Sequence, residues 1–298
     1  MKVAVIGGGA IGLLMASMLT EMGSNVTLYT RTEEQANAIM KRGVKCHYFG
    51  KNERYYPLHA RKFPDLKEEA DLVVICVKQH QLSSVLAFLK QSAMVRHAIP
   101  LFLQNGMGHL SSIEQLPQSV VMAGVVEHGA LRISETDVQQ TGKGALRLFF
   151  VKGNNQDVQR YLQHPILDAV FSENARHTME EKLLANAVIN PLTALFEVEN
   201  GALLHNESLR TLALMLFEEA RSVLNRSDRE KDLAYLWNIC EGTKRNRSSM
   251  LKDIENGTPT EIEAISGYLI KQAEAQNLPV PYTSFVYHAI KAKELVIP

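Results

Sequence analysis

The chain has 298 residues, of which 46% are hydrophobic and 21% charged, and its 32 acidic and 32 basic side chains cancel. This length allows two domains of ordinary size, each with its own apolar core. Because the charges balance, nothing favours binding to nucleic acid or to an anionic membrane. The chain starts with an apolar run, lacks a secretory signal pattern, and has no unbroken run of about 18 apolar residues. We therefore expect a soluble protein of the cytoplasm.

The three cysteines, Cys46, Cys76 and Cys240, are odd in number and far apart in the chain. Such a set suits neither a disulfide framework nor a four-ligand zinc site. We expect three free thiols and no metal.

Short β-branched runs alternate with helical patterns up to about Val151. The runs are Val3–Ile6, Val26–Tyr29, Leu72–Val77, Ile99–Leu103 and Val120–Val126. This alternation is typical of parallel strands joined by crossover helices, and strands that are apolar on both faces fit a sheet covered on both sides. The first half is therefore predicted to be an α/β domain.

Helical periodicity replaces the strand pattern after about Glu173. It is clearest in Glu180–Leu195, Leu209–Leu224 and Thr260–Gln276. We place the boundary near residues 172–178, which gives an α/β domain over 1–175 and an all-helical domain over 176–298. The apolar helical stretches can serve packing within the chain or a dimer interface, and we expect a homodimer.

A glycine motif of the form G-x-G-x-x-G follows the first strand and opens a helix. It consists of Gly7, Gly8, Gly9, Ala10, Ile11 and Gly12. Glycine first in this motif permits a tight turn, the second lets the backbone approach a pyrophosphate, and the third allows close helix–strand packing. The helix N-terminus adds N–H donors and a positive dipole. The alternative is a glycine-rich turn with no ligand; the position of the motif favours a Rossmann-type dinucleotide-binding domain.

Arg31 follows the second strand, where an NAD-preferring enzyme places an acid for the ribose hydroxyl. A planar, permanently charged guanidinium suits a 2′-phosphate, so the expected cofactor is NADP(H). The alternative is a solvated arginine at a strand end. Lys78, which follows the strand Leu72–Val77, can add a second positive contact to the cofactor.

Asn105 lies in the segment Leu103–Gly108, which again follows a strand and contains two glycines. Its side chain can bond the cofactor ribose or the substrate. On local grounds alone, Asn-Gly is simply a common turn pair.

Lys182, Asn186 and Asn190 are spaced at i, i+4 and i+8 and so share one helical face. Their neighbours are mostly apolar, which predicts a half-buried stripe whose polar groups need partners. Pro191 is expected to kink the helix beside Asn190. The alternative is a polar stripe that faces water.

A further polar segment, 246–257, ends in the turn pair Asn256-Gly257, and Thr258-Pro259 then favours the start of a helix. Glu261 is expected in the first turn of that helix. Taken alone, Glu261 can be explained as compensation of the helix dipole, and Ser249 as a surface hydroxyl or a helix start.

Together these segments resemble the ketopantoate reductases, which reduce 2-dehydropantoate to pantoate with NADPH on the route to coenzyme A. The motifs are GGGAIG at 7–12, QNGMG at 104–108, KLLANAVINPLTAL at 182–195, NRSSMLKDI at 246–254 and TEIEAI at 260–265. They occur in order, and the likeness covers nearly the whole chain. One departure is Thr258, where family members often carry an arginine; it leaves the alignment of Glu261 intact.

The resemblance assigns roles to individual residues. Lys182 corresponds to the catalytic lysine, and Glu261 to the acidic residue of the site, where it meets substrate or cofactor. Substrate contacts correspond to Asn186, Asn190 and Ser249. Asn105 corresponds to a residue at the cofactor–substrate junction, and Gly129 lies near a cofactor backbone contact.

The implied reaction moves a hydride to the keto carbon, so negative charge develops on the carbonyl oxygen. A lysine with the ordinary pKa of about 10.4 is protonated at neutral pH and can bond that oxygen and then donate its proton. One rival reading is a related reductase of another 2-oxo acid or of a sugar phosphate. The other is a non-catalytic NADPH sensor that binds a protein partner, which would need no proton donor.

Overall fold

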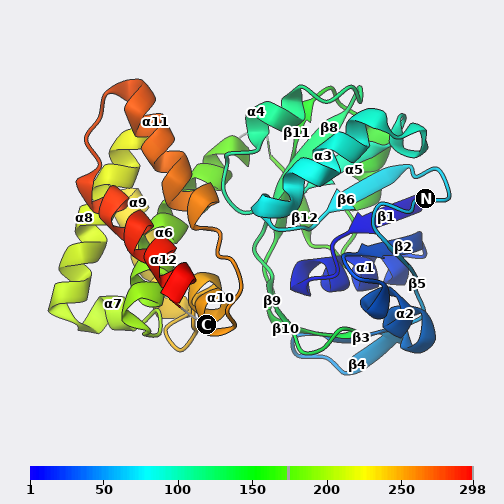
Figure 1. Ribbon diagram of the computed structural model, residues 1–298, viewed down its shortest axis with the longest axis horizontal. Helices are drawn as coiled ribbons and strands as arrows, with labels where there is room; N and C mark the ends of the chain where they lie inside the picture. Colours follow the sequence, from blue (N-terminus) through cyan, green and yellow to red (C-terminus); the bar gives the residue numbers. More distant parts are fainter. Residues whose placement is uncertain (173–174, 297–298) are drawn as a thin grey trace. The chain divides into compact units, whose positions relative to one another are not determined.

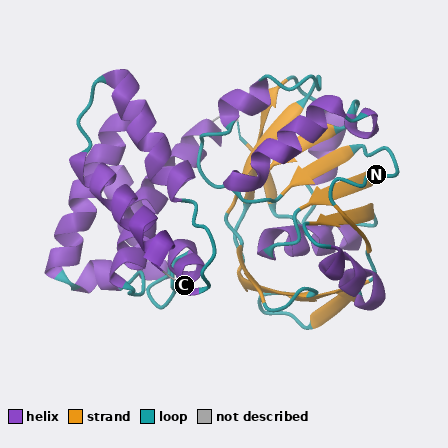
Figure 2. Cartoon of the chain, in the orientation of Figure 1, coloured by secondary structure: helices purple, strands orange, loops and turns teal. Residues whose placement is uncertain are grey.

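The computed structural model describes residues 1–172 and 175–296 (Figure 1). The chain divides into two compact units. The first comprises Met1–Gln104 and His109–Ala175, and the second comprises Asn105–Gly108 and Arg176–Pro298. All strands of the described residues lie in the first unit, whereas the second consists of helices and loops (Figure 2). The assignment of residues 1–175 to NADP binding and of 176–298 to substrate and catalysis stays a prediction.

Eight strands form the main sheet of the first unit, in the order β12-β11-β8-β7-β6-β1-β2-β5. Their bounds are Lys2–Ile6 (β1), Asn25–Thr30 (β2), His59–Lys62 (β5), Leu72–Ile75 (β6), Ile99–Phe102 (β7), Val121–Val126 (β8), Leu146–Lys152 (β11) and Ala169–Phe171 (β12). The strands from β5 to β8 in this order run parallel, β11 is antiparallel to β8, and β12 is parallel to β11. Counted along the chain, the parallel strands follow the Rossmann order 3-2-1-4-5-6. The predicted class, a Rossmann-type α/β domain followed by a helical domain, is confirmed.

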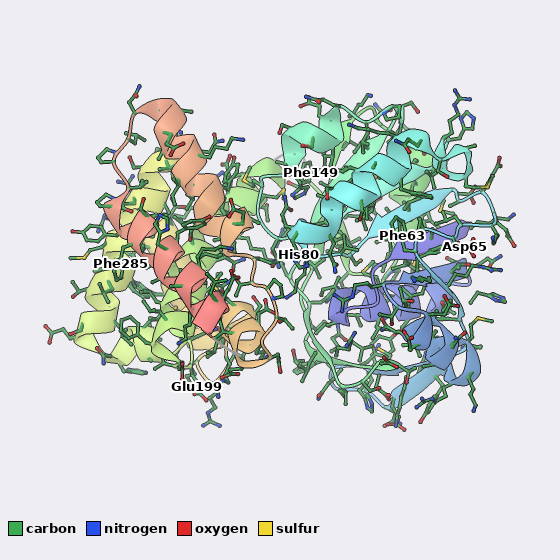
Figure 3. The ribbon with its side chains drawn as sticks, in the orientation of Figure 1. Phe63, Asp65, His80, Phe149, Glu199 and Phe285 are labelled. Carbon is green, nitrogen blue, oxygen red and sulfur yellow. The ribbon has the colours of Figure 1, made fainter. Side chains whose placement is uncertain are left out.

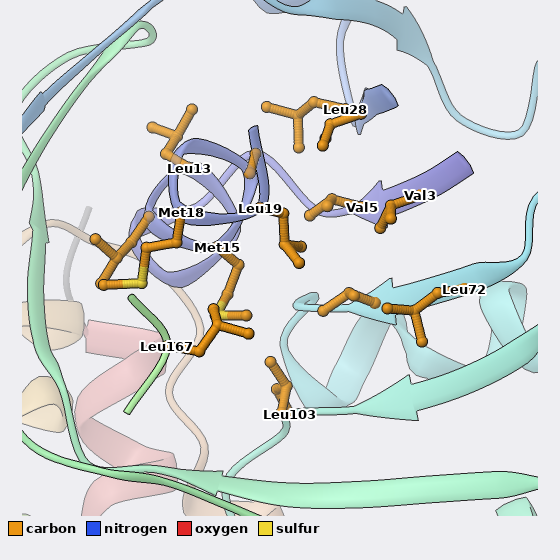
Figure 4. Close-up of a cluster of buried hydrophobic side chains, with 14 of the residues drawn as sticks. Val3, Val5, Leu13, Met15, Met18, Leu19, Leu28, Leu72, Leu103 and Leu167 are labelled. Atoms are coloured by element: carbon orange, nitrogen blue, oxygen red, sulfur yellow. The ribbon is translucent and has the colours of Figure 1, made fainter. Parts of the chain in front are cut away.

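Alternate residues of β1 supply the two faces of this sheet. Val3 and Val5 join a cluster that includes Leu13 of α1 (Figure 4). Ala4 and Ile6 join a cluster on the other face. Both faces are buried because helices cover each of them, which explains the uniformly apolar strands. The helices of this unit are α1 (Ala10–Glu21), α2 (Glu33–Arg42), α3 (Leu82–Gln91), α4 (Leu110–Glu114) and α5 (Gln156–Leu162), with 3₁₀ turns η1 (Gln79–Gln81) and η2 (Ala93–Val95).

A second, four-stranded sheet of the first unit has the order β4-β3-β10-β9. Its strands are β3 (Val44–His47), β4 (Glu53–Tyr56), β9 (Gly129–Arg132) and β10 (Asp137–Gly142). It packs against α1 (Figure 1). The sequence did not predict this sheet, because its strands are short and polar.

The second unit is built around α6 (Ala175–Phe196) and seven further helical elements. These are α7 (Ala202–His205), α8 (Glu207–Val223), α9 (Arg229–Gly242), α10 (Ser249–Glu255), the π-helical turn η3 (Glu263–Gly267), α11 (Tyr268–Gln276) and α12 (Pro281–Val296). Helix α12 packs against α8 and η3.

Two predicted elements need correction. The helix expected over 260–276 contains the π-helical turn η3, and Glu261 precedes the helical residues rather than lying in their first turn. An extra residue in one turn leaves the apolar spacing almost unchanged, so periodicity cannot reveal it. The strand expected over 72–77 ends at Ile75.

None of the helices in the described ranges is both long and apolar enough to cross a membrane. The three cysteines are free, as predicted. Burial raises the pKa of Cys46 to about 11 and those of Cys76 and Cys240 to about 12. All three thiols are therefore protonated at neutral pH.

Candidate functional site

The glycine turn between β1 and α1 leaves no room for side chains at two positions. Gly7 has φ +116, and a Cβ added there would lie 2.9 Å from the carbonyl carbon of Cys76. A Cβ at Gly12 would overlap the carbonyl oxygen of Gly7. At Gly9, by contrast, an added Cβ would meet no described atom within 4 Å. Packing in the protein thus accounts for Gly7 and Gly12, whereas Gly9 borders open space, as the approach of a pyrophosphate requires.

Helix α1 begins at Ala10, with Gly9 as its N-cap in an extended conformation. The first N–H groups of a helix have no partners within the helix, and the dipole makes this end positive. Ala10 and Ile11 add neither charge nor a hydrogen-bonding side chain. The turn and helix end therefore fit the pyrophosphate of a dinucleotide.

The carbonyl of Gly8 is satisfied by protein groups. It accepts hydrogen bonds from Gln35 Nε2 at 2.8 Å and from Arg132 Nη1 at 3.3 Å. Gln35 Nε2 also lies 3.0 Å from the carbonyl oxygen of Glu135. These contacts tie the turn to α2 and to the second sheet. Sequence reasoning missed Gln35 and Arg132, because their partners are distant in the chain and they belong to no local motif.

Arg31 directly follows β2 and is exposed. The turn that carries it is fixed by two threonines: the Thr30 hydroxyl donates to the Thr32 carbonyl at 2.8 Å, and Thr32 Oγ1 accepts from the Gln35 N–H at 3.3 Å. In a Rossmann fold this strand end binds the adenosine ribose. Arg31 therefore occupies a suitable position for contact with a 2′-phosphate, and its role in recognition stays a prediction.

Lys78 is half-buried and occupies the N-cap position of η1, three residues beyond the end of β6. Nearby, Gln104 Nε2 donates to the carbonyls of Ile75 at 2.9 Å and Val77 at 3.1 Å. Gln104 thereby joins the ends of β6 and β7 and shapes the edge of the sheet where ligands bind in this fold.

Gly129 opens β9, and a Cβ there would lie 2.6 Å from Thr141 Oγ1. Pairing with β10 is thus enough to explain this glycine, and its contact with a cofactor stays a prediction. Within residues 1–172 and 175–296 there is no cluster of three metal-ligating His, Cys, Asp or Glu side chains.

The predicted stripe lies on α6. Lys182 and Asn186 are half-buried and Asn190 is buried, while Leu183 and Val188 beside them belong to the apolar interior. The helix continues through Pro191 to Phe196. The stripe therefore places three polar groups on one side of a largely buried helix.

An ion-pair network anchors α6 next to Lys182. The guanidinium of Arg226 pairs with Asp232, and both side chains are almost fully buried, at 5% and 1% exposure. The same guanidinium lies 3.5 Å from Glu181 Oε1. The hydrogen bond to Asp232 raises the pKa of Arg226. Breaking a buried ion pair is costly, because it leaves one charge without compensation. Through Glu181, which precedes Lys182, the network therefore holds the α6 turn that carries Lys182.

Asn105 and Glu261, 156 residues apart, meet in the second unit. Asn105 Nδ2 donates to Glu261 Oε2 at 2.9 Å. Gly106 has φ +79, and a Cβ added there would lie 2.5 Å from the Ala264 carbonyl oxygen in η3. Glycine at 106 therefore lets the loop 105–108 lie directly against the π-helical turn.

The backbone before Glu261 is held by the C-terminal helix. Glu294 Oε1 accepts from the Thr260 N–H at 2.8 Å and from the Thr260 hydroxyl at 2.7 Å. Burial works to raise the pKa of Glu294, but the bonds from Thr260 and Lys291 outweigh it, and the pKa is lowered. Sequence reasoning missed both Thr260 and Glu294.

Ser249 is the exposed first residue of α10, and its predecessor Ser248 caps that helix. Asn200 was not predicted. Its Nδ2 donates to Thr243 Oγ1 at 2.9 Å, but its buried Oδ1 has no hydrogen-bond partner in the described part of the chain. A buried amide oxygen of this kind is a candidate ligand contact.

Two family models match the chain: Ketopantoate reductase PanE/ApbA at residues 3–151, and Ketopantoate reductase PanE/ApbA C terminal at residues 174–294. The chain is similar to the 2-dehydropantoate 2-reductase of Bacillus subtilis (strain 168), with 37% identity over 99% of this chain and 98% of that one. It is also similar to a crystal structure of probable 2-dehydropantoate 2-reductase panE from Bacillus subtilis, with a TM-score of 0.85 and 37% identity over 98% and 100% of the two chains. A ternary structure of D-mandelate dehydrogenase with NADH and anilino(oxo)acetate has a TM-score of 0.90 at 24% identity, covers 99% and 98% of the two chains, and shows the shared fold.

Proposed function

Because the chain belongs to the ketopantoate reductase PanE/ApbA family, we propose that it reduces 2-dehydropantoate to pantoate with NADPH. The observation that carries this proposal is the Asn105–Glu261 hydrogen bond, which joins two segments distant in the chain. The resemblance assigns both residues to the site, from two different motifs, QNGMG at 104–108 and TEIEAI at 260–265. Both lie in the unit that carries the Lys182 stripe.

The cofactor would be held by the first unit. The turn from Gly7 to Gly12 and the N-terminus of α1 would bind the pyrophosphate, and Arg31 the 2′-phosphate. Lys78 would add a positive charge near the same edge of the sheet. Bound NADPH would supply the hydride for the keto carbon of the substrate.

Lys182 would supply the proton. As the hydride reaches the carbonyl carbon, its π bond breaks and the electron pair moves to the oxygen. The protonated Nζ of Lys182 stabilises that charge by a hydrogen bond and then transfers its proton, which yields the hydroxyl of the product.

The neutral polar side chains would orient the substrate. Asn186, Asn190 and Ser249 can hydrogen-bond a carboxylate and hydroxyls without adding charge. Glu261 accepts from Asn105 and can accept from a substrate hydroxyl or from the cofactor as well. Holding the reactants in one orientation is worth about 7–11 kcal/mol over free encounter.

The first test follows NADPH oxidation by absorbance with purified protein and a panel of 2-oxo acids, repeated with NADH. Rapid oxidation of NADPH with ketopantoate, and little with the other acids, is the expected result. Since a D-mandelate dehydrogenase shares this fold, the fold alone does not fix the substrate. A preference for another 2-oxo acid would replace ketopantoate in the proposal but keep the reaction type. NADPH binding with no turnover on any acid would favour the sensor.

The role of Lys182 is tested by Lys182→Met, which keeps the length and the apolar stem. We expect turnover to fall about a hundredfold or more, the usual contribution of a positioned proton donor. The matched control is Lys271→Met on α11, an exposed lysine that should be replaceable at no cost in activity. Near-normal turnover in Lys182→Met would remove Lys182 from the role.

We also propose that the protein is a homodimer. Large apolar side chains lie on the surface of the helical unit, among them Phe285 of α12, which is 66% exposed (Figure 3). An interface between two copies of the chain would remove such side chains from water. Light scattering or sedimentation would give the mass directly, and a monomer at micromolar concentration would refute the dimer.

A further inference from the structure

A pair of buried hydroxyl groups joins α6 to the start of α10. Thr193 Oγ1 lies 2.7 Å from Ser248 Oγ, across 55 residues of chain. Thr193 is 0% and Ser248 6% exposed. The proposed reaction uses neither group, and no local pattern in the sequence requires them to meet.

Each hydroxyl is also bonded to its own helix. Thr193 Oγ1 lies 2.7 Å from the Ile189 carbonyl oxygen and 3.2 Å from that of Asn190. Ser248 Oγ accepts from the Leu251 N–H at 3.1 Å, as the N-cap of α10. Thr193 has one hydroxyl proton, and when it goes to a carbonyl of α6, the Ser248 hydroxyl donates to Thr193 Oγ1. The two hydroxyls thus form a continuous link between the two helix backbones.

The link lies beside two predicted substrate contacts. Asn190 precedes Thr193 by three residues, so the two are neighbours on the surface of α6. Ser249 follows Ser248 directly. The hydroxyl pair therefore joins the two segments that carry Asn190 and Ser249.

Backbone bonds hold the residues just before Ser248 against the loop that follows α6. The Asn200 N–H donates to the Asn246 carbonyl at 3.0 Å, and the Gly201 N–H to the Lys244 carbonyl at 3.0 Å. At Ser248 itself, the Thr193 hydroxyl is the group that reaches across from α6. The backbone bonds thus dock the segment, and the hydroxyl pair adds a side-chain bond to α6 immediately before Ser249.

We propose that Thr193 is a positioning residue that acts through Ser248 to align Asn190 and Ser249 on the substrate. This inference rests on the proposed function, because it takes both residues to contact the 2-oxo acid. Side chains that contact a ligand act best when a surrounding set of hydrogen bonds fixes them before binding. Because both hydroxyls are buried, breaking the pair leaves a polar group that water does not readily satisfy.

Thr193→Val tests the proposal, because it replaces the hydroxyl with a methyl group of similar size. We expect kcat/KM for ketopantoate to fall about tenfold, the factor that corresponds to about 1.4 kcal/mol and to one lost hydrogen bond. The KM for NADPH should not change. Thr193→Ser restores a hydroxyl and should recover most of the loss. Thr211→Val is the matched control, because Thr211 also bonds a carbonyl one turn back, at 3.0 Å to Glu207, but on the exposed side of α8.

Each outcome decides the question. An unchanged kcat/KM for ketopantoate in Thr193→Val overturns the positioning role, provided that the wild type is active. If the kinetic constants for ketopantoate and for NADPH both worsen in Thr193→Val, and Thr193→Ser does not restore them, the positioning role is also overturned. Thr193 then has only a packing role. If Thr193→Val does not fold, Thr193→Ala and Thr193→Ser still differ by one oxygen atom, and equal values for the two overturn it. Failure of the wild type to reduce ketopantoate refutes the proposed function itself, and the inference with it.

Discussion

Gly9→Ala separates two reasons for glycine in the turn before α1: packing within the protein, and room for a ligand. An added Cβ at Gly9 meets no described atom within 4 Å, and the backbone there, at φ −80, is open to alanine. At Gly12 the same methyl group would overlap the carbonyl oxygen of Gly7. We therefore expect Gly9→Ala to fold normally and to lose cofactor affinity, whereas Gly12→Ala should lose stability.

In Gly9→Ala, the expected loss of cofactor affinity is larger than the expected loss of stability. Alanine in place of glycine at an N-cap costs at most about 1 kcal/mol, which lowers Tm by about 2–4 °C in a protein of this size. A methyl group at Gly9 would occupy the place of the pyrophosphate and keep it from the N–H groups at the start of α1. Loss of one charge-assisted hydrogen bond, at about 1.5–3 kcal/mol, raises the Kd for NADPH about 10- to 150-fold.

The assay is a fluorescence titration of NADPH, paired with thermal unfolding of the same samples. Gly12→Ala serves as the control for steric damage, since its defect should already be visible in Tm without cofactor. A wild-type Kd in Gly9→Ala would refute the reasoning, because it would mean that the pyrophosphate does not approach Gly9.

Two further predictions concern a binding preference and acid stability. Arg31→Ala should weaken NADPH binding about tenfold, because one charge-assisted contact at an exposed site is lost. NADH binding should stay nearly unchanged. Equal losses of affinity for both cofactors in the same titration would contradict 2′-phosphate recognition. His109 is buried, neither ring nitrogen has a hydrogen-bond partner among residues 1–172 and 175–296, and burial lowers its pKa to about 4. Between about pH 6.5 and pH 4 the unfolded chain therefore binds a proton at His109 that the folded protein does not. The free energy of unfolding is accordingly highest above pH 6.5 and falls by about 3 kcal/mol as the pH drops to 4. His109→Phe, which keeps a ring beside Phe102, should remove this part of the acid loss in denaturant titrations from pH 8 to pH 4, and parallel pH profiles for variant and wild type would argue against it.

The main sheet could be predicted from the sequence because burial on both faces gives its strands an unmistakable composition. Leu72–Ile75, for instance, is buried at every residue. The second sheet has no such pattern: Glu53–Tyr56 buries one residue of four. Its strands pair across long stretches of chain, Lys45 with Asp137 for example. Polar strands that pair so far apart in sequence leave no local periodicity to detect.

The chemistry of the candidate site could be predicted more fully than its support. Lys182, Asn105 and Glu261 belong to motifs with a characteristic order and spacing. Gln35 and Glu294 belong to none, yet they fix the backbone at Gly8 and at Thr260 by bonds that cross 27 and 34 residues. A glutamine or glutamate on a helix surface has many uses, and only the folded chain shows which backbone group it meets. Groups that hold a site in place are for this reason harder to predict than groups that act in it.

Asn105 shows that the order of residues along the chain does not always predict the structural unit to which a side chain belongs. In the sequence, Asn105 follows a strand of the main sheet and belongs with the dinucleotide-binding half. In the structure, the loop 105–108 groups with the helical unit, where Asn105 bonds Glu261 and Gly106 lies against Ala264. The chain thus leaves the first unit for four residues and returns to it before α4. Asn105 and Glu261 therefore belong to one unit, and the glycine turn belongs to the other. By its place in the sequence, Asn105 belongs to the predicted dinucleotide-binding domain. In the structure it belongs to the unit that carries Lys182.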